Sequence, residues 1–171
     1  MRRFAATAFG VGCLVWAASS QAALAQGELV GSDGRVLGKI TAAEGPGGVL
    51  IAVTAAGLPP GPHGFHIHEV GACEPPFASA GGHYNPTGRK HGLLHPEGSH
   101  LGDLPNVFVG PDGALRAELF APGVALTGGP FPILDGDGAS MVLHEGPDDH
   151  RTDPAGASGG RIACAVLRLT P

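Results

Sequence analysis

The sequence is poor in charged and aromatic residues, and long stretches of strong helix formers are missing. Of 171 residues, 15% are charged and 5% aromatic. Without such stretches a helical bundle is excluded. Gly (30) and Pro (16) are plentiful, but 43% of residues are hydrophobic and no short repeat organises the glycines, which argues against disorder. The composition favours one compact domain of short strands joined by loops.

An apolar run long enough to span a membrane is also missing. The uncharged run from Phe4 to Ala18 falls short of the ~20 residues that a spanning helix needs. It follows two arginines and precedes small residues, a layout that predicts a secretory signal peptide over residues 1–25, cleaved after Ala22 or after Ala25. A retained signal anchor is the less favoured alternative. We therefore expect residues 26–171 to be a periplasmic or secreted domain, free of the membrane after cleavage.

Basic residues and cysteines are scarce. Removing the signal leaves 8 basic against 15 acidic residues, a formal charge of −7. Nucleic acid is then a poor partner, because its binding needs a basic surface that neutralises phosphates. Cys13 leaves with the signal, and the remaining pair, Cys73 and Cys164, predicts one disulfide in an oxidising compartment.

Apolar stretches bounded by Gly, Pro or Asp indicate about eight short strands. They span residues 28–30, 35–41, 49–54, 64–69, 106–109, 114–120, 140–144 and 161–169. Since there is neither βαβ alternation nor an amphipathic helix, they predict an antiparallel sandwich or flattened barrel. Two long polar stretches, 71–105 and 145–160, break the strand rhythm, and we expect them to be functional loops.

All nine histidines lie at or beyond position 63. His66 and His68 are two apart on a predicted strand, where side chains i and i+2 share a face, so both imidazoles can reach one metal. Alone, this pattern is weak, because two unrelated polar residues on an exposed strand face would look the same.

The first long loop adds three imidazoles and a carboxylate: His83, His91, His100 and Asp103. Three neutral nitrogens and one hard oxygen suit tetrahedral Zn²⁺, and one tight turn can deliver both His100 and Asp103. A fully liganded zinc leaves no position for a nucleophilic water, so this site would be structural. Solvent-exposed loop histidines are the alternative.

Five motifs together resemble the copper,zinc superoxide dismutases of the secreted or periplasmic bacterial type. They are GPHGFHIH from position 61, GGHYNP from 81, HLGDLP from 100, VLHEGPDD from 142 and GGRIAC from 159. The resemblance covers essentially the whole mature chain. It implies an eight-stranded antiparallel Greek-key β-barrel or sandwich. It also implies an enzyme that dismutes superoxide to oxygen and hydrogen peroxide by alternating reduction and oxidation of copper, beside a structural zinc.

Carried over to this sequence, the resemblance assigns both metal sites. The implied copper ligands are His66, His68, His83 and His144. The implied zinc ligands are His83, His91, His100 and Asp103, so His83 would bridge the two metals.

The resemblance also assigns three supporting features. Asp148 matches the carboxylate that ties the copper ligand His66 to the zinc ligand His91. Arg161 matches the arginine that attracts superoxide beside the copper, a local positive field that a charge of −7 makes necessary. Cys73 and Cys164 match the family's disulfide.

Some questions stay open at the level of sequence. His63 matches a structural, hydrogen-bonded histidine, whereas His95 and His150 have no counterpart, and the loop lengths leave a homodimer open. The alternative function is a metal carrier on the same barrel, against which Arg161 and the bridging place of His83 both argue. A zinc hydrolase is disfavoured, because neither site combines three ligands, an open position and an adjacent general base.

Overall fold

The fold is almost entirely β-structure. The structure is a computed structural model that describes residues 24–170, so the predicted signal peptide lies almost wholly outside the described residues. The strands are β1 Leu24–Gly31, β2 Val36–Gly45, β3 Gly48–Ala55, β4 Gly61–His63, β5 Phe65–His68, β6 Val107–Val109, β7 Leu115–Pro122, β8 Ser140–His144, β9 Arg161–Val166 and β10 Arg168–Leu169. One short 3-10 helix, η1 Ala78–Ala80, interrupts the first long loop.

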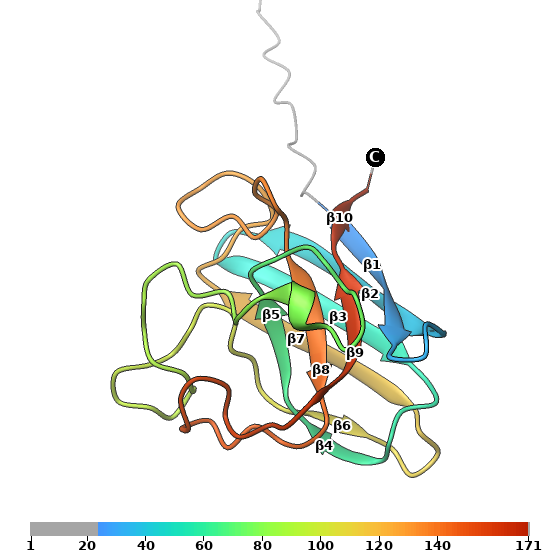
Figure 1. The fold of residues 1–171 in the computed structure, drawn as a ribbon. Coiled ribbons are helices and arrows are strands. Elements are labelled where there is room, and N and C mark those ends of the chain that lie inside the picture. The colour runs from blue at the N-terminus through green and yellow to red at the C-terminus, as the bar shows by residue number, and fades with distance from the viewer. Residues whose placement is uncertain (1–23, 171) are drawn as a thin grey trace, which may run out of the picture.

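One curled antiparallel sheet forms most of the barrel (Figure 1). Its order is β5-β8-β9-β1-β2-β3-β7, with β10 also pairing β1, and a separate two-stranded sheet joins β4 to β6. Every pairing between strands is antiparallel. The all-β antiparallel prediction is therefore confirmed.

Two differences separate these strands from the eight that the sequence predicts. Strand β4 was missed because its middle residue is Pro62, which is typical of turns and edges, yet the segment pairs with β6. The last predicted strand is divided at Leu167, whose N–H donates to the carbonyl of Ala139 (3.1 Å) instead of to a strand partner. Residues 123–139 form a third long irregular segment that the sequence analysis did not single out.

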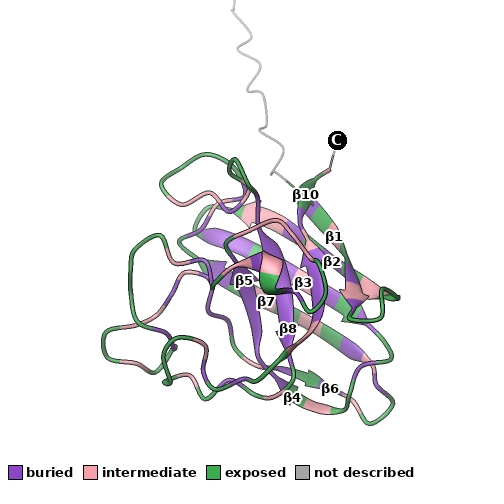
Figure 2. Ribbon diagram, in the orientation of Figure 1, coloured by how far each residue is buried: buried purple, intermediate pink, exposed green. Residues whose placement is uncertain are grey.

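The burial pattern explains the strands (Figure 2). In β3, buried Val49, Ile51 and Val53 alternate with more exposed neighbours, as expected for a sheet with one face on the core. By contrast, β5 and β8 are buried at every position. Phe65 and Ile67 pack into the main core, so the other face of these two strands must be covered by something else.

The two predicted long loops supply that cover. The loop between β5 and β6 contains η1 and no strand, and the loop between β8 and β9 contains neither helix nor strand. Figure 1 shows both loops on the same side of the barrel. They are tied together by the N–H of Leu94, which donates to the carbonyl of His150 (3.0 Å).

Among the residues that the structure describes, no helix is long and apolar enough to cross a membrane.

Candidate metal centre

Four buried histidines converge between the sheet and the loops. They come from β5, from the first long loop and from the end of β8: His66, His68, His83 and His144. One ligand atom from each lies within 4.8 Å of those of the others. The period-two geometry of β5 explains half of the group, because it puts both of its histidines on the face opposite Phe65 and Ile67.

The ring nitrogens of this first group divide into two kinds. His66 Nδ1, His68 Nε2, His83 Nε2 and His144 Nε2 are buried and have no hydrogen-bond partner among the described residues. The other nitrogen of three rings is occupied: His68 Nδ1 donates to Gly81 O (3.1 Å), His144 Nδ1 to Gly159 O (3.4 Å) and His66 Nε2 to Asp148 Oδ2 (2.6 Å). These three donations leave a lone pair on the unpartnered nitrogen of each of the three rings. Together with His83 Nε2, four buried nitrogens without a hydrogen-bond partner fit a metal ion that accepts imidazole ligands.

The second group surrounds one carboxylate oxygen. Asp103 Oδ1 lies 2.9 Å from His83 Nδ1, 2.9 Å from His91 Nδ1 and 3.3 Å from His100 Nδ1. Asp103 Oδ2 accepts the backbone N–H groups of Gly92 (2.8 Å) and His100 (3.0 Å), which wraps the loop around the carboxylate. Three nitrogens and one oxygen in close contact fit a tetrahedral zinc site.

His83 belongs to both groups. Its Nε2 is the unpartnered nitrogen of the first group, and its Nδ1 faces Asp103 in the second. An imidazole can offer both nitrogens as ligands only when it carries no proton. The ring orientation of His83 is therefore that of a bridge between two metals.

The pKa of His91 differs from the pKa values of His68, His83 and His144. Burial lowers the pKa of His68 to about 2, of His144 to about 3 and of His83 to about 4, so these rings are neutral at pH 7. For His91, burial also lowers the pKa, but the hydrogen bonds with Asp103 and Asp148 outweigh burial and raise it to about 9. In the metal-free protein His91 therefore carries a positive charge at pH 7.

Asp148 links the two groups by contacting one histidine of each. One carboxylate oxygen contacts His66 Nε2 (2.6 Å) and the other contacts His91 Nε2 (3.1 Å). Burial raises the pKa of Asp148, but the hydrogen bonds from both histidines outweigh burial and hold this pKa far below its usual range. Gly156 leaves the room for this contact: its φ is +64°, and a Cβ at that position would lie 2.8 Å from His91 Nε2.

Asn106 holds Asp148 in place, and the sequence analysis missed it. Its Nδ2 donates to the carbonyl of Asp148 and its Oδ1 accepts the N–H of Asp148, both at 2.8 Å. In the sequence, Asn106 appeared only as the first residue of a predicted strand. No local pattern marks it, because its partner lies 42 residues away.

The three remaining histidines lie outside both groups. His63 contacts the carbonyls of His144 and Pro59, each at 2.8 Å, so it braces the backbone of the first group. His95 is partly exposed, and its Nδ1 accepts the N–H of Glu97 (3.0 Å). His150 donates its backbone N–H to Asp148 (2.6 Å).

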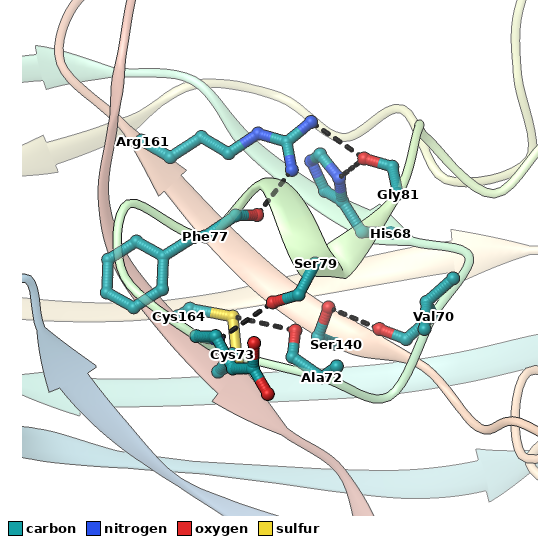
Figure 3. Close-up of a disulfide and its surroundings, with 11 residues drawn as sticks. His68, Val70, Ala72, Cys73, Phe77, Ser79, Gly81, Ser140, Arg161 and Cys164 are labelled. Atoms are coloured by element: carbon teal, nitrogen blue, oxygen red, sulfur yellow. Dashed lines mark hydrogen bonds between the residues drawn. A yellow bond between two sulfur atoms is a disulfide. The ribbon is translucent and has the colours of Figure 1, made fainter.

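Arg161 lies beside the first group (Figure 3). It is the first residue of β9 and pairs with His144 at the end of β8. Its Nη1 donates to Phe77 O (2.6 Å) and its Nη2 to Gly81 O (2.7 Å), the same carbonyl that accepts from His68. The guanidinium and a ring of the first group thus share one acceptor.

The predicted disulfide is present. Cys73 and Cys164 are bonded, with a Cα–Cα distance of 5.7 Å and a sequence separation of 91 residues. The bond joins the start of the first long loop to β9, three residues after Arg161 (Figure 3). It therefore fastens the loop that carries the whole second group to the central sheet.

Comparisons with known proteins identify the family. The copper/zinc superoxide dismutase (SODC) family matches residues 36–167. The chain is 46% identical to superoxide dismutase [Cu-Zn] 2 of Aquifex aeolicus (strain VF5), over 98% of this chain and 100% of the relative. It is also 46% identical to superoxide dismutase [Cu-Zn] of Caulobacter vibrioides, over 80% of each chain.

Solved structures agree with the sequence relatives. A SOD-like protein from Bacillus subtilis superposes with a TM-score of 0.80 at 42% identity, over 84% of this chain and 97% of that one. Cu/Zn superoxide dismutase from Brucella abortus superposes with a TM-score of 0.68 at 31% identity, over 85% and 99%. Sequence, fold and the paired histidine groups agree, and the chain belongs to the copper/zinc superoxide dismutase family.

Proposed function

We propose that this chain dismutes superoxide to oxygen and hydrogen peroxide, with each metal bound by one of the two groups. The proposed copper ligands are His66, His68, His83 and His144. The proposed zinc ligands are His83, His91, His100 and Asp103. The observation that carries the proposal is the ring of His83, which offers Nε2 to one group and Nδ1 to the other. A copper ion held by these residues would supply the one-electron redox chemistry that dismutation needs.

The protein's own residues bind the substrate and move a proton. Arg161 supplies a positive charge next to the first group, where an anion must approach despite an acidic chain. His83 Nε2 faces the first group and is the nitrogen that can hold a proton and pass it to the nascent peroxide. His83 Nδ1 meanwhile stays directed at Asp103, so the ring keeps its place through the cycle.

The proposal is tested by following superoxide decay after pulse radiolysis. Mature protein loaded with copper and zinc is compared with protein that carries zinc alone. We expect fast decay that needs copper and that slows as salt is added, because salt screens the field around Arg161. Tight copper binding without faster decay would instead support the metal carrier.

Zinc binding is expected to strengthen as pH rises. Because the pKa of His91 is about 9 in the metal-free protein, its ring must lose a proton before Nδ1 can bind a metal. At pH 7 about one proton should leave this ring per zinc bound, and the affinity should rise about tenfold per pH unit and level off near pH 9. Calorimetry in buffers of different ionisation enthalpy measures the number of protons released per zinc bound. His95→Gln is the control, and a pH-independent affinity would contradict the assignment.

Replacing Asp148 by asparagine is expected to weaken zinc binding. The change keeps the shape of the side chain but replaces one of the two carboxylate oxygens by a donor NH2, so only one of His66 and His91 keeps an acceptor. A lost partner of this kind costs about 10- to 100-fold in metal affinity. Competition with a zinc chelator measures the effect, with Asp112→Asn in a distant exposed turn as the matched control. Equal affinities in the two variants would show that Asp148 does not orient the ligands.

We also propose export to the periplasm with cleavage after Ala22. Strand β1 begins at Leu24, and Ala25, 1% exposed, pairs with Leu169 and Ala42. A cut after Ala25 would remove both of these strand residues, whereas a cut after Ala22 keeps them. The intact mass of protein from the periplasmic fraction should therefore match a chain that begins at Ala23. A mass that matches a chain beginning at Gln26 would contradict this cleavage site.

A homodimer stays a prediction from the sequence.

A further inference from the structure

Phe77 combines two properties that seldom occur together. Its side chain is fully buried, and its backbone has φ 70°, in the left-handed region that bulky residues rarely adopt. It lies directly before η1 and makes no side-chain cap for that helix. A residue in this conformation must be fixed by its surroundings, which points to a task for the backbone at this position.

The ring of Phe77 is anchored apart from the main core. It packs in a small cluster with Ala80, Val142 and Cys164, and partly buried Val30 and Cys73 pack against the same cluster. The anchor therefore includes both halves of the disulfide and one residue of β8. Because these elements are fixed by the sheet and by the disulfide, they hold the N-terminal end of η1.

The carbonyl of Phe77 is directed away from this anchor. In Figure 3 it points to Arg161, whereas the ring points away from the guanidinium. Phe77 O accepts from Arg161 Nη1 at 2.6 Å and also from the N–H of Ala80 at 3.2 Å. At the other end of η1, Gly81 O accepts from Arg161 Nη2 (2.7 Å). One helical turn thus carries both acceptors that orient the guanidinium.

We propose that Phe77 is a positioning residue for Arg161. The buried ring fixes the N-terminal end of η1, the left-handed backbone turns the carbonyl towards Nη1, and the pair of carbonyls aims the guanidinium at the mouth of the first histidine group. Phe77 contacts Arg161 through its backbone carbonyl, so the ring acts on the guanidinium by holding η1 in place. This inference rests on the proposed role of Arg161 in attracting superoxide.

The test measures the freedom of Arg161 directly. Wild type, Phe77→Ala, Phe77→Leu and Phe131→Ala are loaded with copper and zinc, and their disulfide is verified by thiol titration. Each is treated with phenylglyoxal well below its melting temperature, and modification of Arg161 is followed by peptide mass spectrometry. Phe131, which packs on the main core, is the control for general loss of an aromatic side chain.

Phe77→Ala should modify about tenfold faster at Arg161, because losing one charge-assisted hydrogen bond changes a population by about that factor. Phe77→Leu, which keeps apolar bulk in the cluster, should stay near wild type, as should Phe131→Ala. If Phe77→Ala does not fold, Phe77→Val takes its place and should modify at an intermediate rate. Wild-type reactivity in a folded Ala or Val variant would overturn the proposal.

Superoxide decay on the same samples distinguishes a failure of this inference from a failure of the proposed function on which it rests. A faster-modified Arg161 together with slower decay and a weaker salt dependence would support both. Faster modification with unchanged decay would support Phe77 as the positioning residue but overturn the role of Arg161 in attracting substrate. Unchanged modification with slower decay would overturn the positioning role of Phe77.

Discussion

Replacing His144 by alanine is expected to abolish superoxide dismutation while zinc still binds. His144 supplies one of the four unpartnered nitrogens of the first group, at Nε2, and no atom to the second group. Its loss leaves three imidazoles for copper but the full ligand set for zinc. Superoxide decay should therefore fall to the rate of protein that carries zinc alone. Metal analysis after dialysis should still find about one zinc per chain.

Two variants control this experiment. His95→Ala removes a partly exposed histidine outside both groups and should leave decay and metal content unchanged. His100→Ala removes a ligand from the second group only and should lose zinc. A His144→Ala protein that still catalyses at the wild-type rate would show that the first group is not the catalytic copper site.

Breaking the disulfide is expected to have the largest effect on stability. Cys73 and Cys164 are 91 residues apart, and opening a loop of that length is worth about 4 to 5 kcal/mol in the chain-entropy model. Urea unfolding of the mature, metal-free protein with and without a thiol reductant should show this loss in the free energy of unfolding. The reductant should have no effect on the double variant Cys73→Ser, Cys164→Ser.

Reduction of the disulfide should also lower the activity. The disulfide packs against Phe77, and Phe77 contacts Arg161, so the reduced protein should show slower superoxide decay as well as lower stability. An unchanged unfolding midpoint in reductant would mean that the bond does not constrain the unfolded chain. A serine variant that is as stable as the oxidised wild type would lead to the same conclusion.

Local patterns were enough to predict much of the fold. The apolar run at residues 49–54 predicted strand β3, and the period of two in β5 put His66 and His68 on one face. The predictions failed where distant contacts decide the structure. Strand β4 exists because β6 pairs with it, although Pro62 is typical of a turn. The break at Leu167 depends on a carbonyl 28 residues earlier in the chain, at Ala139.

Part of the candidate site could likewise be predicted from local patterns, and part of it could not. Metal-binding side chains can be recognised from residue type and spacing, and the two groups gather the residues that the sequence singled out. The residues that orient these side chains cannot be recognised in this way. Asn106 acts through a pairing with Asp148, and Phe77 acts through its carbonyl, a group that every residue has. Only the folded chain shows which carbonyl faces Arg161.

The central place of β1 has a consequence for how the molecule folds. One edge of β1 pairs with β2, which follows directly in the chain, but its other edge pairs with β9 and β10 at the C-terminus. The sheet cannot close until the last residues are available. Such high contact order makes folding slow, in the range of milliseconds to seconds. Under the export proposed above, a chain that stays unfolded until its C-terminal strands are available would be able to cross a membrane before it folds.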